Sequence, residues 1–207
     1  EFLRKNYRIV LLNTYTGAIK FVDEMPTTVK KYIARDCVQK SKINEYILKN
    51  KLNKDYQIMW ATGPKQYDIL KERLLDNNIN INNIENAKIV SYIYNMEEIM
   101  NVANLIVARS GAMTITEISN LGKPSILIPL PNVSGDHQLH NAKVLENIGA
   151  ARIILNNELN YENLNSNIEE IILNKNTIET MSKNALKVST SNVEDKIFTE
   201  IKKIVRE

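Results

Sequence analysis

The sequence predicts an α/β fold built on a doubly wound parallel sheet, and three observations favour this class. Short β-rich segments alternate with segments of helical periodicity along most of the chain. The β-rich segments are continuous apolar runs, such as "IVLL", "LIVA" and "SILIPL", which are typical of strands buried on both faces. Gly122, Pro124 and Gly149 stand where helical segments are expected to end.

The strands are predicted in order along the chain as short segments separated by one helix or a long connection. They are residues 7–12, 56–61, 87–91, 104–107, 125–128 and 151–154. Right-handed βαβ connections between such strands produce a parallel sheet with helices on both sides.

Helices are predicted from apolar residues that recur at helical spacing. They are residues 20–32, 44–51, 65–76, 96–102, 114–121, 137–147, 161–173 and 193–205. The stretch 33–53 is polar and long, and is interpreted as an insertion or an additional helix.

Composition indicates a globular chain of 207 residues, 43% hydrophobic and 25% charged, which suits one large domain or one domain with an appendage. The net charge of +3 is too small to indicate a nucleic-acid partner. No apolar run approaches the length of a membrane span and no signal peptide opens the chain, so a soluble intracellular protein is expected. The chain enters a strand almost at once without an initiating Met, which indicates a fragment of a longer protein.

Metal and disulfide chemistry is not expected. Cys37 is the only cysteine, and His137 and His140 are the only histidines. An internal disulfide or a thiolate cluster is therefore impossible, and an all-protein zinc site is not expected.

Four loops are predicted to lie beyond the carboxyl ends of the strands, where open α/β sheets bind ligands. They are residues 13–18, 92–95, 109–113 and 129–136. No Ser–His pair, G-x-S-x-G motif or metal-ligand spacing accompanies them, so no catalytic residue is assigned in this chain. The pattern indicates a domain that holds a nucleotide sugar rather than a complete catalytic machine.

The third loop, "RSGAM", carries the most information. Small residues follow a buried strand there, and the next helix begins with unpaired N–H groups and a positive dipole that suit a phosphate. Glu117 in that helix has two interpretations. The spacing Thr114-x-x-Glu117 fits a capping box, whereas a carboxylate beside this loop also suits the hydroxyls of a ribose. The Thr114-x-x-Glu117 spacing alone favours the capping role. The surrounding order of buried strand, small-residue loop and second helix start favours ribose binding.

The other three loops are less specific. In the fourth, Asp136 is a candidate N-cap, and His137 and Gln138 carry donors and acceptors that suit sugar hydroxyls, although exposed helix residues are the alternative for the histidines. In the second, residues 92–93 could flank a flat base or belong to the core. The first, "NTYTGA", has one glycine, Gly17, and is weak as a phosphate cradle.

The segment "ANLIVARSGAMTITEISNLGKPSILIPLPNVSGDHQLHNAKVLENIGAARII" resembles the carboxyl-terminal, donor-binding domain of the MurG family, glycosyltransferase family 28. Its members are membrane-associated and transfer N-acetylglucosamine from UDP-N-acetylglucosamine to lipid I, completing lipid II for bacterial peptidoglycan. The likeness is specific from about residue 87 to 154. It implies that the whole chain, residues 1–207, is one Rossmann-like half of a GT-B fold. The acceptor-binding half, with the presumed general base, would lie outside this chain.

The resemblance also implies roles for particular residues. Uracil would be held through the main chain at Ile93, the ribose at Glu117, and the N-acetylglucosamine at Gln138 with His137 beside it. The loop and helix start around the ribose and diphosphate would comprise Ala112, Met113, Thr114, Ile115, Thr116 and Glu117. No cofactor or metal is implied beyond the donor itself, and the lipid-linked acceptor would be met by the other half.

One segment departs from the family pattern. The glycine-rich "GGSxGA" loop of the family appears here as "NTYTGA", with Tyr15 at the serine and only Gly17 and Ala18 kept. Three functions therefore stay open: the donor half of a lipid II-forming transferase, the donor half of a related glycolipid or split two-subunit transferase, and a nucleotide-sugar-binding module without catalysis.

Overall fold

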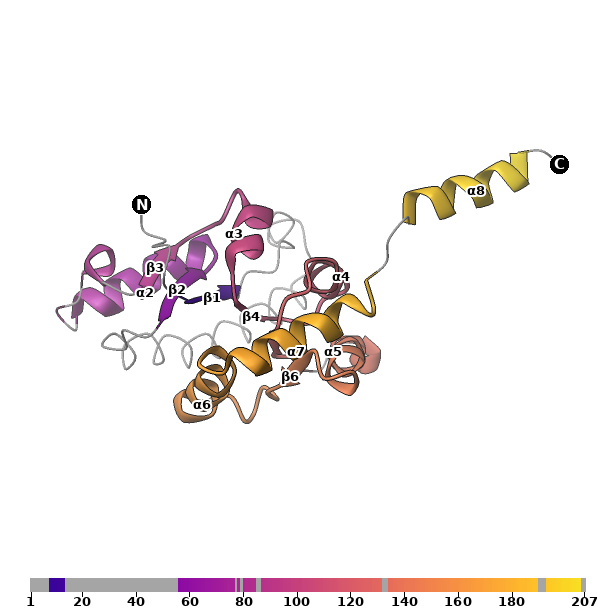
Figure 1. The fold of residues 1–207 in the computed structure, drawn as a ribbon. Coiled ribbons are helices and arrows are strands. Elements are labelled where there is room, and N and C mark those ends of the chain that lie inside the picture. Colours follow the sequence, from indigo (N-terminus) through magenta and orange to yellow (C-terminus); the bar gives the residue numbers. More distant parts are fainter. Residues whose placement is uncertain are drawn as a thin grey trace.

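A parallel sheet of six strands forms the centre of the protein (Figure 1). The computed structural model describes residues 8–13, 56–76, 78, 80–84, 87–131, 134–189 and 193–205. The strands are β1 (Arg8–Asn13), β2 (Tyr56–Ala61), β3 (Ala87–Val90), β4 (Leu105–Ala108), β5 (Ser125–Leu127) and β6 (Ala151–Ile153). They lie in the order β3-β2-β1-β4-β5-β6, and every neighbouring pair is parallel. This confirms the predicted fold class, and each strand ends within one residue of its predicted position.

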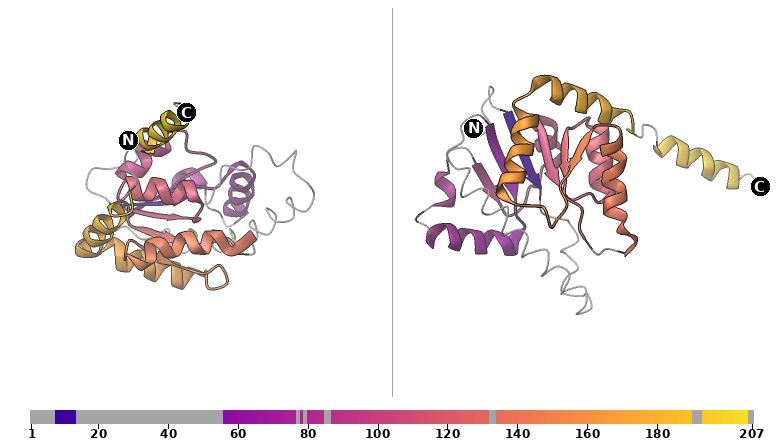
Figure 2. Two further views of the ribbon diagram at one scale, coloured as in Figure 1. Left: turned by 90° about the vertical axis from the view of Figure 1, so that its right-hand side faces the viewer. Right: turned by 90° about the horizontal axis from the view of Figure 1, so that it is seen from below.

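Helices connect the strands and lie on both sides of the sheet (Figure 2). The α-helices are α2 (Pro64–Asp76), α3 (Met96–Val102), α4 (Ala112–Asn120), α5 (His137–Asn147), α6 (Tyr161–Ile172), α7 (Lys175–Leu186) and α8 (Val193–Val205). Two 3-10 turns, η2 (Ile81–Asn83) and η3 (Ser134–Asp136), lie between them. Six predicted helices are confirmed, whereas those at 20–32 and 44–51, and the stretch 33–53, lie outside the described residues. The sequence prediction missed α7.

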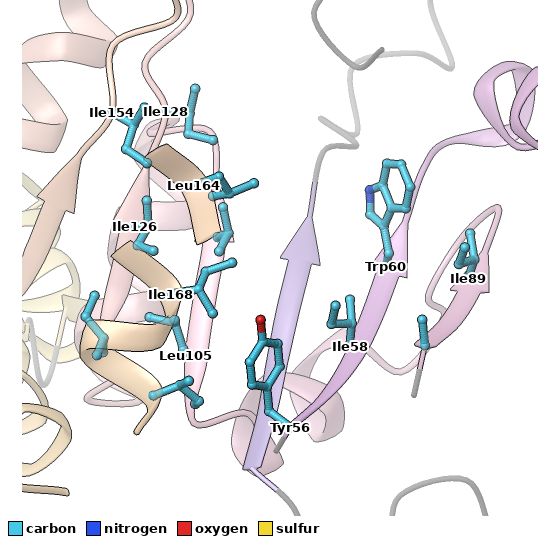
Figure 3. Close-up of a cluster of buried hydrophobic side chains, with 14 of the residues drawn as sticks. Tyr56, Ile58, Trp60, Ile89, Leu105, Ile126, Ile128, Ile154, Leu164 and Ile168 are labelled. Atoms are coloured by element: carbon cyan, nitrogen blue, oxygen red, sulfur yellow. The ribbon is translucent and has the colours of Figure 1, made fainter. Parts of the chain in front are cut away.

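The core consists of two apolar clusters, one on each face of the sheet. Successive residues of a strand point to opposite faces. Leu105 and Val107 of β4 accordingly belong to one cluster, and Ile106 and Ala108 to the other. In Figure 3, Tyr56, Ile58 and Trp60 of β2 point the same way into the first cluster. Helices α2 and α6 also contribute to this cluster, and α3, α4 and α5 to the second.

The two glycines predicted to end helices do so. Gly122 and Gly149 have φ of 59° and 69°, the left-handed conformation that glycine adopts most readily. After α4, the N–H of Lys123 reaches back to the carbonyl of Ile118 at 2.9 Å. This turn directs the chain into β5.

Helix α8 extends away from the rest of the protein (Figure 1). Ile197, Phe198, Ile201 and Ile204 on this helix are all more than half exposed. No helix in the described ranges is both long enough and apolar enough to cross a membrane.

The strand order determines where a ligand can bind. The strand that follows β1 and the strand that follows β4 lie on opposite sides of this pair, so the carboxyl ends of β1 and β4 are the topological switch point at which open α/β sheets bind ligands. The register pairs Asn13 with Ala108, so β1 and β4 end side by side at this edge of the sheet. The predicted loops after β3 and β5 open on the same edge because all the strands run parallel.

Candidate functional site

The loop between β4 and α4 is shorter than the sequence predicted. Strand β4 ends at Ala108, and α4 begins at Ala112 with Gly111 as its N-cap residue. The helix therefore starts two residues before the predicted Thr114, and its first turn contains Ala112, Met113 and Thr114. This turn follows β4 at the switch point between β1 and β4, and the unpaired N–H groups of a helix start suit an anion.

The capping-box interpretation of Glu117 is wrong. A capping box needs Thr114 at the N-cap position, but Thr114 is the third residue inside α4 and the N-cap makes no side-chain hydrogen bond. Glu117 is the sixth residue of the helix, too far along to reach the N-cap N–H. Its side chain is exposed and, among the described residues, its carboxylate has no hydrogen-bond or salt-bridge partner. Partial desolvation raises the pKa of Glu117 above its ordinary 4.5.

The predicted site residues in the first turns of α4 differ in their exposure to solvent. Ala112 is exposed and Met113 is 75% exposed, whereas Thr114 and Ile115 are half-buried. The Thr116 hydroxyl donates to the carbonyl of Ala112 at 3.1 Å. That bond uses the only proton of the hydroxyl, so Thr116 offers a ligand acceptor lone pairs alone.

The loop after β3 places Ile93 with its side chain in the second core cluster, only 5% exposed. A buried side chain leaves the main chain as the part of Ile93 that a ligand can contact, as the resemblance implies. Tyr92 and Tyr94 beside it are both exposed, with ring centroids 4.9 Å apart in an edge-to-face arrangement.

The start of α5 brings one of its two predicted site residues into a fixed position. Gln138 is 8% exposed, and its Oε1 accepts the backbone N–H of Leu130 at 2.9 Å. This bond orients the amide so that Nε2, with its two protons, is the part left to donate. His137 beside it is exposed. Asp136 is the N-cap residue as predicted, in a left-handed conformation with φ of 48°, but its side chain makes no capping bond.

Arg109 has a role that the sequence did not reveal. Arg109 is 8% exposed, and its Nη1 lies 3.0 Å from the Ile128 carbonyl, 3.3 Å from the Pro129 carbonyl and 3.0 Å from Asn156 Oδ1. These acceptors belong to the segments that follow β5 and β6. A cavity of about 320 Å³ lies between the same two segments.

Ser110 and Asn141 are also part of this edge and were not among the predicted site residues. Ser110 is fully buried, and its Oγ donates to the Gln138 carbonyl at 2.7 Å. Asn141 Nδ2 donates to the Ser110 carbonyl at 3.1 Å. A small polar residue between a buried strand and a helix is the only local signal for Ser110.

Two further sequence-based expectations concern the phosphate loop and metal ligands. Tyr15 and Gly17 of the "NTYTGA" loop lie outside the described residues, so their part in the site stays a prediction. Within the described ranges, no three His, Cys, Asp or Glu side chains come together as metal ligands.

Comparison with known protein families identifies the domain to which this carboxyl edge of the sheet belongs. Residues 18–197 match the family model described as the glycosyltransferase family 28 C-terminal domain. The chain belongs to this family. The match includes β2 to β6 and every described residue of the predicted site.

Curated relatives of this family 28 domain are longer than the chain. The UDP-N-acetylglucosamine--N-acetylmuramyl-(pentapeptide) pyrophosphoryl-undecaprenol N-acetylglucosamine transferase of Lactobacillus johnsonii is 36% identical over 182 residues, covering 88% of this chain and 48% of the relative. The transferase of the same name from Ruminiclostridium cellulolyticum is 38% identical over 167 residues, covering 79% of this chain and 45% of the relative. The chain thus spans about half the length of the curated relatives it matches.

Solved structures agree on the fold. The crystal structure of Acinetobacter baumannii MurG superposes with a TM-score of 0.70 at 22% identity, covering 97% of this chain and 54% of that one. The glycosyltransferase VinC, crystallised with dTDP, superposes with a TM-score of 0.59 at 13% identity, covering 97% of this chain and 41% of that one. The family 28 domain therefore shares its Rossmann-like fold with about half of each of these solved chains, and this fold is the one that the sequence predicted.

Proposed function

We propose that the chain is the donor-binding domain of an inverting transferase that moves N-acetylglucosamine from UDP-N-acetylglucosamine to lipid I, forming lipid II. The family match over residues 18–197 carries this proposal, supported by curated relatives named as N-acetylglucosamine transferases. Those relatives are about twice as long, so the acceptor site and the general base belong to the half outside this chain. We place the full-length enzyme in the cytoplasm, attached to the inner face of the cell membrane through that other half.

The first turn of α4 is the proposed diphosphate seat. Its exposed start at Ala112 and Met113, with Thr114 behind them, presents backbone N–H groups at the positive end of the helix. When the sugar is transferred, the bond between its anomeric carbon and the UDP oxygen breaks and negative charge grows on the diphosphate. N–H groups already aimed at this position stabilise that charge without reorganising.

The remaining donor contacts follow from the same edge. Glu117 accepts the two ribose hydroxyls, because its carboxylate has no partner among the described residues and lies on the helix whose start holds the phosphates. The main chain at Ile93 meets the uracil, and Nε2 of Gln138 donates to a sugar hydroxyl with His137 beside it. The acceptor hydroxyl, deprotonated by the other half, attacks the anomeric carbon from the opposite side and inverts it.

Titration calorimetry of the 207-residue chain with UDP-N-acetylglucosamine, UDP-galactose and UDP tests the proposal. We expect binding of UDP and a preference for UDP-N-acetylglucosamine over UDP-galactose. Absence of heat with all three ligands would contradict the donor-domain assignment. Equal affinity for the two sugars would remove the role given to Gln138.

A second candidate is a nucleotide-sugar-binding module without catalysis, and the "NTYTGA" sequence favours it because two family glycines are absent. The donor half of a related glycolipid or split two-subunit transferase is a further form of the first proposal. The two candidates can be distinguished by joining the chain to the acceptor domain of a curated relative and measuring transfer to lipid I. A non-catalytic module would bind the donor and give no product.

Gly111 offers a specific prediction for the diphosphate seat. Its φ of −64° is ordinary, and an added Cβ would meet no described atom within 4 Å, so the fold has room for alanine. We expect Gly111→Ala to change the free energy of unfolding by less than about 1 kcal/mol. If a diphosphate packs against this Cα, the added methyl weakens UDP binding about tenfold, or roughly 1.4 kcal/mol. Unchanged UDP affinity would place the diphosphate elsewhere.

A further inference from the structure

Two hydrogen bonds join the β4–α4 loop directly to the start of α5. The Ser110 Oγ donates to the Gln138 carbonyl, and Asn141 Nδ2 donates to the Ser110 carbonyl, at 2.7 and 3.1 Å. Ser110 lies between the end of β4 and the start of α4, so its carbonyl has no partner in either element and depends on Asn141. Both bonds lie at least partly away from solvent, where losing one leaves a polar group unsatisfied.

Gln138 is the residue on which these contacts converge. Its carbonyl is held by Ser110, and its side-chain Oε1 is held by the Leu130 N–H at 2.9 Å. The backbone and the side chain of Gln138 are thus both fixed, and its Nε2 is aimed by groups that do not themselves face a ligand. Ser110 cannot contact a bound molecule with its side chain, because that side chain is completely buried.

We propose that Ser110 and Asn141 are positioning residues that hold the sugar-recognising start of α5 in register with the nucleotide-binding start of α4. This inference rests on the proposed function and adds to it the source of sugar selectivity. Displacement of a positioned group by about 1 Å is enough to cost a large factor in recognition. The loss should fall on the sugar, since α4 and Glu117 keep their own contacts with the nucleotide.

The test is the ratio of the dissociation constants for UDP-galactose and UDP-N-acetylglucosamine, measured by calorimetry with the full chain. Asn141→Ala is expected to reduce this ratio about tenfold while UDP affinity changes by less than about twofold. Asn147→Ala is the matched control, because Asn147 is an exposed asparagine at the other end of the same helix. The control should keep the wild-type ratio.

Ser110→Ala is the second variant, since it removes only the hydroxyl and should reduce the ratio in the same way if Asn141→Ala does not fold. Ser110→Thr retains the hydroxyl and should restore part of the ratio. A ratio unchanged in Asn141→Ala and Ser110→Ala, or equal weakening of all three ligands, would overturn the positioning role. Wild-type chain that binds no ligand would overturn the proposed function itself, so the two failures are distinguishable.

Discussion

Replacing Glu117 by Gln is expected to weaken UDP binding by about 1.5–3 kcal/mol, or roughly 10- to 150-fold, because hydrogen bonds to a charged acceptor are worth this much. The amide of Gln can accept one ribose hydroxyl but lacks the charge and the second oxygen acceptor. Titration calorimetry with UDP measures the change. Glu146→Gln, at an exposed glutamate on α5, is the matched control and should bind UDP as wild type does.

The stability of the same variant separates ligand binding from helix capping. If Glu117 capped the helix, its substitution would lower the free energy of unfolding by about 0.5 kcal/mol. The structure predicts no such loss. Desolvation raises the pKa of Glu117 above 4.5, so ionising this carboxylate disfavours the folded state. Protonated Glu117 therefore contributes to the free energy of unfolding. This contribution is fully present below pH 4.5 and is lost as the pH rises through the raised pKa of the folded state. At neutral pH Glu117→Gln should therefore be at least as stable as wild type in urea unfolding.

The pH dependence of binding provides an independent signature of Glu117. Ribose hydroxyls donate to the carboxylate, so a ligand favours the ionised form and its affinity falls as the pH drops towards the pKa of Glu117, above 4.5. UDP-N-acetylglucosamine is the suitable ligand because its diphosphate has no proton that titrates there. The Glu117→Gln profile is the reference, because this variant lacks the carboxylate and keeps every other group at the same edge. Parallel profiles for the two proteins would contradict the ribose contact.

The sheet and its functional edge could be predicted from sequence because burial on both faces leaves a strong local signal. Runs such as Leu105–Ala108 contain no polar residue, and all four of these side chains are buried. Left-handed glycines at Gly122 and Gly149 then mark where helices end. Once the strands and their order of connection are known, the loops at the carboxyl edge follow from topology alone.

The details that were wrong or missed depend on contacts distant in sequence. Helix α7 was missed because only Met181 and Ala185 are buried in a largely polar segment, so its stability comes from packing on α4 and α6. The start of α4 was misplaced because Thr114-x-x-Glu117 imitates a capping box. Gly111 is the N-cap instead, and Ser110 before it makes its hydrogen bonds with Gln138 and Asn141, about 30 residues away in the sequence.

Replacing Arg109 by Met is expected to destabilise the protein by about 3–4 kcal/mol. Met retains the apolar stem but removes the donor shared by the Ile128 carbonyl, the Pro129 carbonyl and Asn156 Oδ1, and leaves buried acceptors unsatisfied. Urea unfolding followed by tryptophan fluorescence measures the loss, because Trp60 is the only tryptophan and is 1% exposed on β2. Arg109→Lys, which keeps a charge and fewer donors, should fall between wild type and Arg109→Met.

Arg152 is the matched control for this prediction because it is also an arginine at a strand of the same sheet. Its Nη1 pairs with Glu170 at 2.6 Å, but the two side chains are 35% and 63% exposed. Solvent screens such a pair, so Arg152→Met should cost no more than about 1 kcal/mol. Equal losses in the two variants would contradict the role of Arg109. A much larger loss at Arg109 would instead show that one buried guanidinium holds together the segments after β4, β5 and β6, on which the proposed sugar site depends.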